Sequence, residues 1–152
     1  MICDVSNIIY DANYVTATLE AAGKTLLALP GCGFSPGLSA GGLDVVRNAI
    51  EAYGWTELPI RPPVPRARAI SEMDQALRWL SLIPNDRYVL RRIVGARLLV
   101  HPVTDRHLFT WRRVGKVLGC DYRAIQRWHA EAIDLIVRAL HARNNFQWGC
   151  SS

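Results

Sequence analysis

The residues best suited to a recognisable chemistry lie in the six positions from Tyr122 to Arg127. Tyr122, Arg123, Gln126 and Arg127 recur at a spacing that places them on one side of a helix. Arginine donates two hydrogen bonds to guanine, and glutamine forms a matching pair with adenine. A tyrosine at a helix start can donate its hydroxyl to a phosphate or press its ring against a thymine methyl. We therefore predict that these four side chains contact the bases of double-stranded DNA.

Two helical patterns joined by a tight turn would position these side chains, between Thr110 and Leu135. Gly119 is suited to ending the first helix, because a helix C-terminus favours a residue that can adopt positive φ. Asp121 can cap the amides of the second helix. A helix, a short turn with glycine and a second helix with a basic front form the helix-turn-helix pattern. The residues expected to face inward from the two helices are Trp111, Val114, Val117, Leu118, Ile125, Trp128, Ala132, Ile133 and Ile136.

The helix that precedes the turn carries basic residues on its other side, and in this motif it crosses the DNA backbone. Such residues bind phosphates, which positions the protein without reading sequence. The alternative is that all these polar side chains form the solvated surface of a helical hairpin. The residues expected to contact phosphate are Thr110, Arg112, Arg113, Lys116 and His129.

The charge of the chain is distributed unevenly along its 152 residues. Residues 1–60 hold two basic residues and six acidic ones, whereas residues 61–143 hold 16 basic residues and seven acidic ones. An arginine-rich half suits a polyanion, because each neutralised phosphate releases counterions. No apolar run approaches the roughly 18 residues of a membrane span, and the N-terminus lacks the basic start of a signal peptide. We expect a cytoplasmic protein, in a bacterium or a phage-infected cell.

No residues combine into a catalytic or metal site. The chain lacks paired carboxylates on one face, a nucleophile beside a base, HExxH and a Walker lysine. The cysteines Cys3, Cys32, Cys120 and Cys150 are scattered, and the histidines are not at metal spacing. We therefore predict no enzymatic activity, no metal and no cofactor.

Helical spacing and proline or glycine breaks predict an all-α protein without strands. The expected helices cover residues 14–29, 43–53, 69–82, 86–100, 110–118 and 122–141. Ser71 and Asp74 have the spacing of a capping box near the start of the third of these helices.

Four prolines close together in residues 59–65 favour a polyproline-like linker. They divide the chain into an acidic part with a helical pair and a basic part. The predicted regions are an N-terminal region at 1–58, a Pro/Arg-rich linker at 59–68, a DNA-binding domain at 69–143 and a flexible tail at 144–152.

From Pro84 to Leu140 the order of features resembles region four of sigma factors. The matching segments are IPNDRYVLRRIVGARLL, TWRRVGKVLG and CDYRAIQRWHAEAIDLIVRAL. The resemblance implies that Tyr122, Arg123, Gln126 and Arg127 enter the major groove, and that RNA polymerase is a partner. The chain departs from the family pattern in a longer connection, at residues 101–109, and in an aspartate before the recognition helix.

Most of the chain is also similar to an uncharacterised family of small helix-turn-helix proteins from alphaproteobacteria and their phages. The segments that carry this similarity are VTATLEAAGKTLLALP, DVVRNAIEAYGW, the proline-rich linker and ISEMDQALRWLSLIP. The similarity implies DNA binding but no particular role.

Three functions are compatible with these features. The first is a transcription regulator, with RNA polymerase or another transcription protein bound through the N-terminal region. The second is a phage small terminase subunit that recognises the packaging site as a homo-oligomer, although no long oligomerisation helix is evident in the sequence. The third is a protein-interaction module that does not bind DNA.

Overall fold

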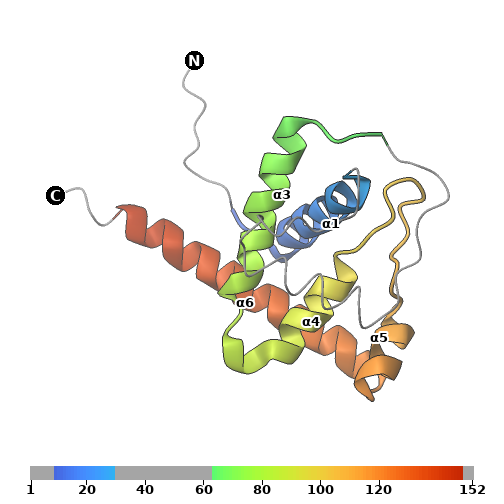
Figure 1. The fold of residues 1–152 in the computed structure, drawn as a ribbon. Helices are drawn as coiled ribbons and strands as arrows, with labels where there is room; N and C mark the ends of the chain where they lie inside the picture. The colour runs from blue at the N-terminus through green and yellow to red at the C-terminus, as the bar shows by residue number, and fades with distance from the viewer. Residues whose placement is uncertain (1–8, 30–62, 149–152) are drawn as a thin grey trace.

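The computed structural model describes residues 9–29 and 63–148, and the regular elements among them are helices (Figure 1). The all-α prediction is confirmed. The helix expected at 43–53 and residues 59–62 of the predicted linker lie outside the described residues. Within the described residues, no helix is both long enough and apolar enough to cross a membrane. The elements are α1 (Ala12–Ala28), α3 (Ala67–Trp79), the 3₁₀ turns η1 (Leu80–Leu82) and η2 (Asn85–Arg87), α4 (Tyr88–Arg97), α5 (Trp111–Leu118) and α6 (Tyr122–Trp148).

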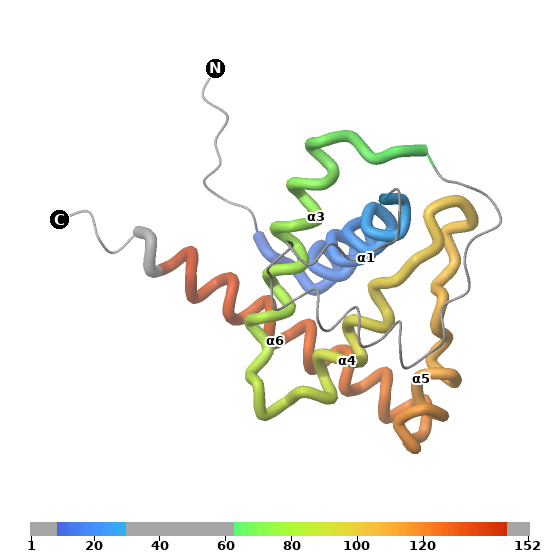
Figure 2. The backbone as a smooth tube through the Cα atoms, viewed as in Figure 1, coloured from blue at the N-terminus to red at the C-terminus, as the bar shows by residue number. Residues whose placement is uncertain are grey.

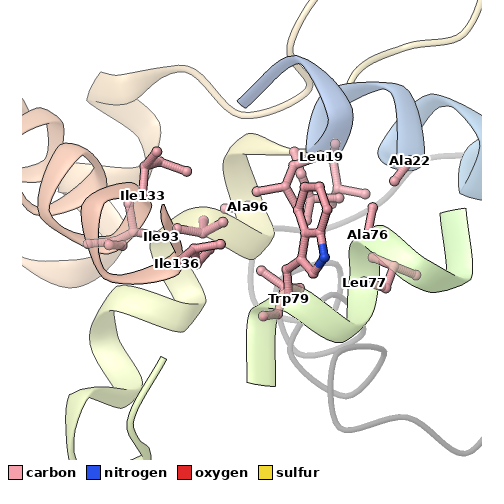
Figure 3. Close-up of a cluster of buried hydrophobic side chains, with 14 of the residues drawn as sticks. Leu19, Ala22, Ala76, Leu77, Trp79, Ile93, Ala96, Ile133 and Ile136 are labelled. Carbon is pink, nitrogen blue, oxygen red and sulfur yellow. The ribbon is translucent and has the colours of Figure 1, made fainter. Parts of the chain in front are cut away.

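One hydrophobic core joins all the helices of the described part. Helix α1 contributes residues at spacings of three and four, such as Val15, Leu19 and Ala22, and packs against α3. Figure 3 shows Leu19 of α1 beside Trp79 of α3, and Ile133 and Ile136 of α6 beside Ile93 of α4. A helix from the predicted N-terminal region therefore shares its core with the predicted DNA-binding domain.

The long helix α6 packs against three other helices. It lies across α4, packs against α5 near the N-terminus of α6 and also contacts α1 (Figure 1). Its buried residues Ile125, Ala132 and Ile136 follow helical spacing, so that one side of the helix faces the core. The C-terminal turns of α6 extend beyond the other helices. The helix expected to end at residue 141 continues to Trp148.

Several helix ends differ from the sequence-based expectation. Ser71 does not begin a capping box, because α3 already starts at Ala67 and the Ser71 hydroxyl donates to the Ala67 carbonyl. The expected helix at 86–100 ends at Arg97. Val117, expected to face inward, is 45% exposed. Short helices bury only one narrow stripe, and on α5 that stripe is formed by Trp111, Val114 and Leu118.

The connection between α4 and α5 is a small hairpin rather than an irregular loop (Figure 2). The His101 amide donates to the Arg106 carbonyl at 2.8 Å, and the Leu108 amide donates to the Leu99 carbonyl at 3.0 Å. Asp105 turns the chain with a positive φ of 56°, which aspartate tolerates better than most residues. Its carboxylate lies 2.7 Å from the Lys24 ammonium, so the hairpin is tied to α1.

Gly23 is the point where α1 meets the start of this hairpin. A Cβ atom at position 23 would lie 1.9 Å from the Leu98 carbonyl oxygen, a backbone atom that cannot rotate away. We predict that Gly23→Ala lowers the free energy of unfolding by about 2 kcal/mol or more, because overpacking a close contact forces backbone movement. Urea denaturation followed by circular dichroism measures this change. Ala21→Ser, on the exposed side of the same helix, should stay within about 0.5 kcal/mol of wild type. An unchanged Gly23→Ala protein would contradict this packing.

Candidate nucleic-acid interface

A threonine caps the start of α5, and two glycines shape the turn between α5 and α6. The Thr110 hydroxyl accepts a hydrogen bond from the Arg113 amide at 3.3 Å and so caps α5. Gly119 ends the helix in the left-handed region with φ of 70°. A Cβ at Gly115 would lie 2.6 Å from the Cys120 carbonyl oxygen, so only glycine allows the chain to turn this closely over the helix. The two helices are therefore joined by a tight turn at residues 119–121, as the sequence pattern predicted.

The side chains predicted to read bases lie together on the first two turns of α6. Arg123, Gln126 and Arg127 are exposed, while Ile125 between them is fully buried. The three exposed side chains line one shallow surface hollow together with Asp121 and Ala130. We call this surface, with Tyr122 beside it, the α6 front face. It offers guanidinium and amide groups to solvent, with one carboxylate at its edge.

Two arginines from different helices lie near the Tyr122 ring. The guanidinium carbon of Arg112 on α5 and that of Arg123 on α6 each lie 5.8 Å from the centre of the Tyr122 ring. Arg123 also donates from Nε to the Tyr122 hydroxyl at 3.3 Å. Because an aromatic ring attracts cations to its face, Tyr122 keeps two positive charges close together at the junction of the helices.

The predicted phosphate-contacting residues of α5 are all exposed. Thr110, Arg112, Arg113 and Lys116 lie at the start and along the outer side of this helix. Arg113 extends over the Phe109 ring, with its guanidinium carbon 5.3 Å from the ring centre. These residues carry three positive charges on the exposed side of α5, and Arg112 among them lies near Tyr122 of the front face.

His129, also predicted to contact phosphate, is only partly exposed, unlike the side chains of this surface. Its side chain points inward, where it meets the Trp111 ring edge-on with 5.2 Å between the ring centres. Residues of α1, α4 and α6 surround it, among them Glu20 and Arg97. The helical spacing that placed His129 near the front face could not show that α5 covers it.

Arg97 connects α4 to the start of α5. Its guanidinium carbon lies 3.9 Å from the centre of the Trp111 ring, and its Nη1 donates to the Phe109 carbonyl at 2.8 Å. The Arg97 carbonyl contacts His107 Nδ1 at 2.9 Å, and His107 Nε2 lies 3.4 Å from the Glu20 carboxylate. Burial lowers the pKa of Arg97, and the Glu20 carboxylate opposes this shift. The sequence alone gave no signal for this network, because its members are far apart in the chain.

Sequence reasoning also missed the contact of Arg87 with α6. Arg87, in η2, forms an ion pair with Glu131, which is 44 positions further along the chain. Helical periodicity connects only residues that are close in sequence, so it could not associate η2 with the surface of α6.

A protein-family model described as "Domain of unknown function (DUF6362)" matches residues 42–136. The match covers more than half of the chain, and the chain belongs to this family. No curated protein and no solved structure matches it. The matched region includes α5 and the α6 front face, whereas α1 lies outside it.

The environment of His129 predicts that acid destabilises the fold. Burial, followed by the charges of Arg97 and His107, lowers the pKa of His129 from 6.5 to about 4. The folded state therefore binds fewer protons than the unfolded state between these pH values, so stability falls as the pH drops from 6.5 to 4. The shift corresponds to about 3 kcal/mol.

Urea denaturation of wild type and His129→Gln at several pH values from 7 to 4 checks this prediction. The variant should be less stable at pH 7 and should lose much less stability on acidification. His141→Gln removes an exposed histidine of the same helix and should keep the wild-type pH dependence. Parallel pH curves for wild type and His129→Gln would show that His129 is not the titrating group.

Proposed function

We propose that this protein binds double-stranded DNA sequence-specifically and regulates transcription, with the first turns of α6 in the major groove. The observation that carries the proposal is the α6 front face, where Arg123, Gln126 and Arg127 are exposed next to a glycine turn. A helix with side chains is about 10–12 Å across, which fits the roughly 12 Å width of the major groove.

The chemistry of the front face suits base edges. Each arginine can donate two hydrogen bonds to O6 and N7 of guanine, and Gln126 can pair with N6 and N7 of adenine. One such pair discriminates against a wrong base by about 1–3 kcal/mol. In this arrangement Thr110, Arg112, Arg113 and Lys116 bind phosphates and hold α6 in position. The DNA is that of a bacterium or of an infecting phage, in the cytoplasm.

A transcription protein such as RNA polymerase is the proposed partner. A single recognition helix makes few base contacts, so tight binding needs a dimer or a second protein. The similarity to region four of sigma factors supports RNA polymerase as that second protein.

One observation favours packaging of phage DNA by a terminase subunit as a second candidate function. Helix α6 has 27 residues, and its C-terminal turns extend beyond the other helices (Figure 1). A projecting helix of this length is suited to oligomer formation. Light scattering distinguishes the two functions, because a ring-forming terminase subunit would have the mass of a large oligomer, whereas a regulator of this kind would be a monomer or dimer.

Arg127→Ala and Lys116→Ala test the proposed roles directly. A preferred duplex is first selected from a random pool with the wild-type protein. Arg127→Ala should then weaken binding to that duplex by about 1–3 kcal/mol and relax the preference at one base pair. Lys116→Ala should weaken binding to all duplexes equally and reduce the salt slope by about one.

Arg68→Ala provides the matched control, because Arg68 is exposed on α3 and paired with Glu72. It removes the same charge away from the proposed interface and should leave affinity close to wild type. If the wild-type protein does not bind duplex DNA at about 0.1 M salt, the proposed DNA binding is wrong and a protein-interaction module is favoured.

Tyr122 should affect affinity through the arginines that it holds. Tyr122→Leu removes the ring that Arg112 and Arg123 both approach, and we expect about two- to fivefold weaker binding, since exposed cation–π contacts contribute about 0.5–1 kcal/mol. Tyr122→Phe keeps the ring and should retain most of the affinity. If Phe reduces binding as much as Leu, the hydroxyl itself contacts DNA, and the ring is not the important part.

A further inference from the structure

A second cluster of arginines lies further along α6 than the front face. Arg87 of η2 and Arg127 and Arg138 of α6 line a surface groove of about 380 Å³ together with Glu131 and Asp134. Arg87 reaches this groove from a separate element and forms its ion pair with Glu131 there. We call this the Arg87 groove.

The Arg87 groove is continuous with the α6 front face. Arg127 and Ala130 line both the groove and the hollow of the front face. Ala130 lies one turn beyond Gln126, and its small side chain leaves the surface between the two sites open. A duplex that places bases against Arg123 and Gln126 would therefore bring its backbone close to the Arg87 groove.

The charges of the groove suit one phosphodiester. Three guanidinium groups and two carboxylates leave one excess positive charge, which matches the single negative charge of a backbone phosphate. Glu131 and Asp134 would repel any further phosphate, so the groove accepts one and no more. The planar guanidinium of Arg87 carries five N–H donors, so that it can bind a phosphate oxygen in addition to a carboxylate.

The ion pair of Arg87 does not prevent such a contact. The side chains of Arg87 and Glu131 are both 47% exposed, so water already reaches the pair. Ion pairs this exposed contribute little to stability, so partial exchange of Glu131 for a phosphate costs little. A charge-assisted bond from arginine to phosphate is stronger than a neutral hydrogen bond.

We infer that the Arg87 groove binds one backbone phosphate of the duplex whose bases face α6, with Arg87 and Arg138 as its ligands. The inference rests on the proposed DNA binding. It assigns to η2 a role in fixing the position of α6 along the major groove of the DNA, since phosphate contacts set register and orientation. It also means that DNA contacts extend beyond the two helices of the helix-turn-helix.

Arg87→Gln and Arg138→Gln, with Arg68→Gln as the control, test this inference. Each groove variant should bind both the selected duplex and a random duplex about three- to tenfold more weakly at about 0.1 M salt. Each should reduce the slope of log affinity against log salt by about 0.9, because one phosphate contact is lost. The base preference should stay as in wild type. Arg68→Gln removes the same charge from α3 and should change neither quantity. Circular dichroism verifies that all variants are folded.

Glu131→Gln provides an independent measurement with the opposite expected sign. It removes a competing carboxylate and should raise affinity for both duplexes by at least twofold. A variant whose only effect was to break a structural ion pair would bind DNA no better than wild type. Unchanged or weaker binding by Glu131→Gln overturns the inference.

The outcomes separate this inference from the proposed function. If wild type binds duplex DNA and Arg127→Ala relaxes its preference, but Arg87→Gln behaves like Arg68→Gln, the groove does not bind a phosphate and the front face remains the reader. If wild type does not bind duplex DNA, both proposals are wrong.

Discussion

The position of α5 depends on the Arg97 guanidinium, which is held between the Trp111 ring and the Phe109 carbonyl. A partly buried guanidinium is tolerated only when its N–H groups have hydrogen-bond acceptors and nearby groups stabilise its positive charge. Here the Trp111 ring stabilises the positive charge, and the Phe109 carbonyl accepts a hydrogen bond from Nη1. Because Phe109 and Trp111 flank the cap residue Thr110, the same contacts determine where α5 begins.

The geometry of the proposed interface follows from this anchor. With α5 fixed on α4, the close turn at Gly115 and Gly119 determines how α6 leaves it. Arg112 of α5 and Arg123 of the α6 front face then lie near the same ring, that of Tyr122. Polar groups that would otherwise be scattered along two helices form one basic surface.

Helix α1 contributes to the core, although its residues precede the part of the sequence that the family model matches. It packs against α3 and supports the hairpin at two points, through Lys24 with Asp105 and through Glu20 with His107. The hairpin in turn leads directly into the start of α5. The orientation of the helix-turn-helix therefore depends on a helix that is far from it in sequence.

Local patterns in the sequence determined the helices, the turn and the exposed residues of the front face. Apolar spacing defined the inward sides of α1 and α6, and Gly119 and Thr110 marked the ends of α5, because these features depend on neighbours within one or two turns. Only the tertiary structure decided the rest. Periodicity could not show that α5 would cover His129, that residues 98–109 would fold back as a hairpin, or that Arg87 would reach Glu131. Those outcomes depend on contacts between residues far apart in the chain, whose energies appear only when the helices pack.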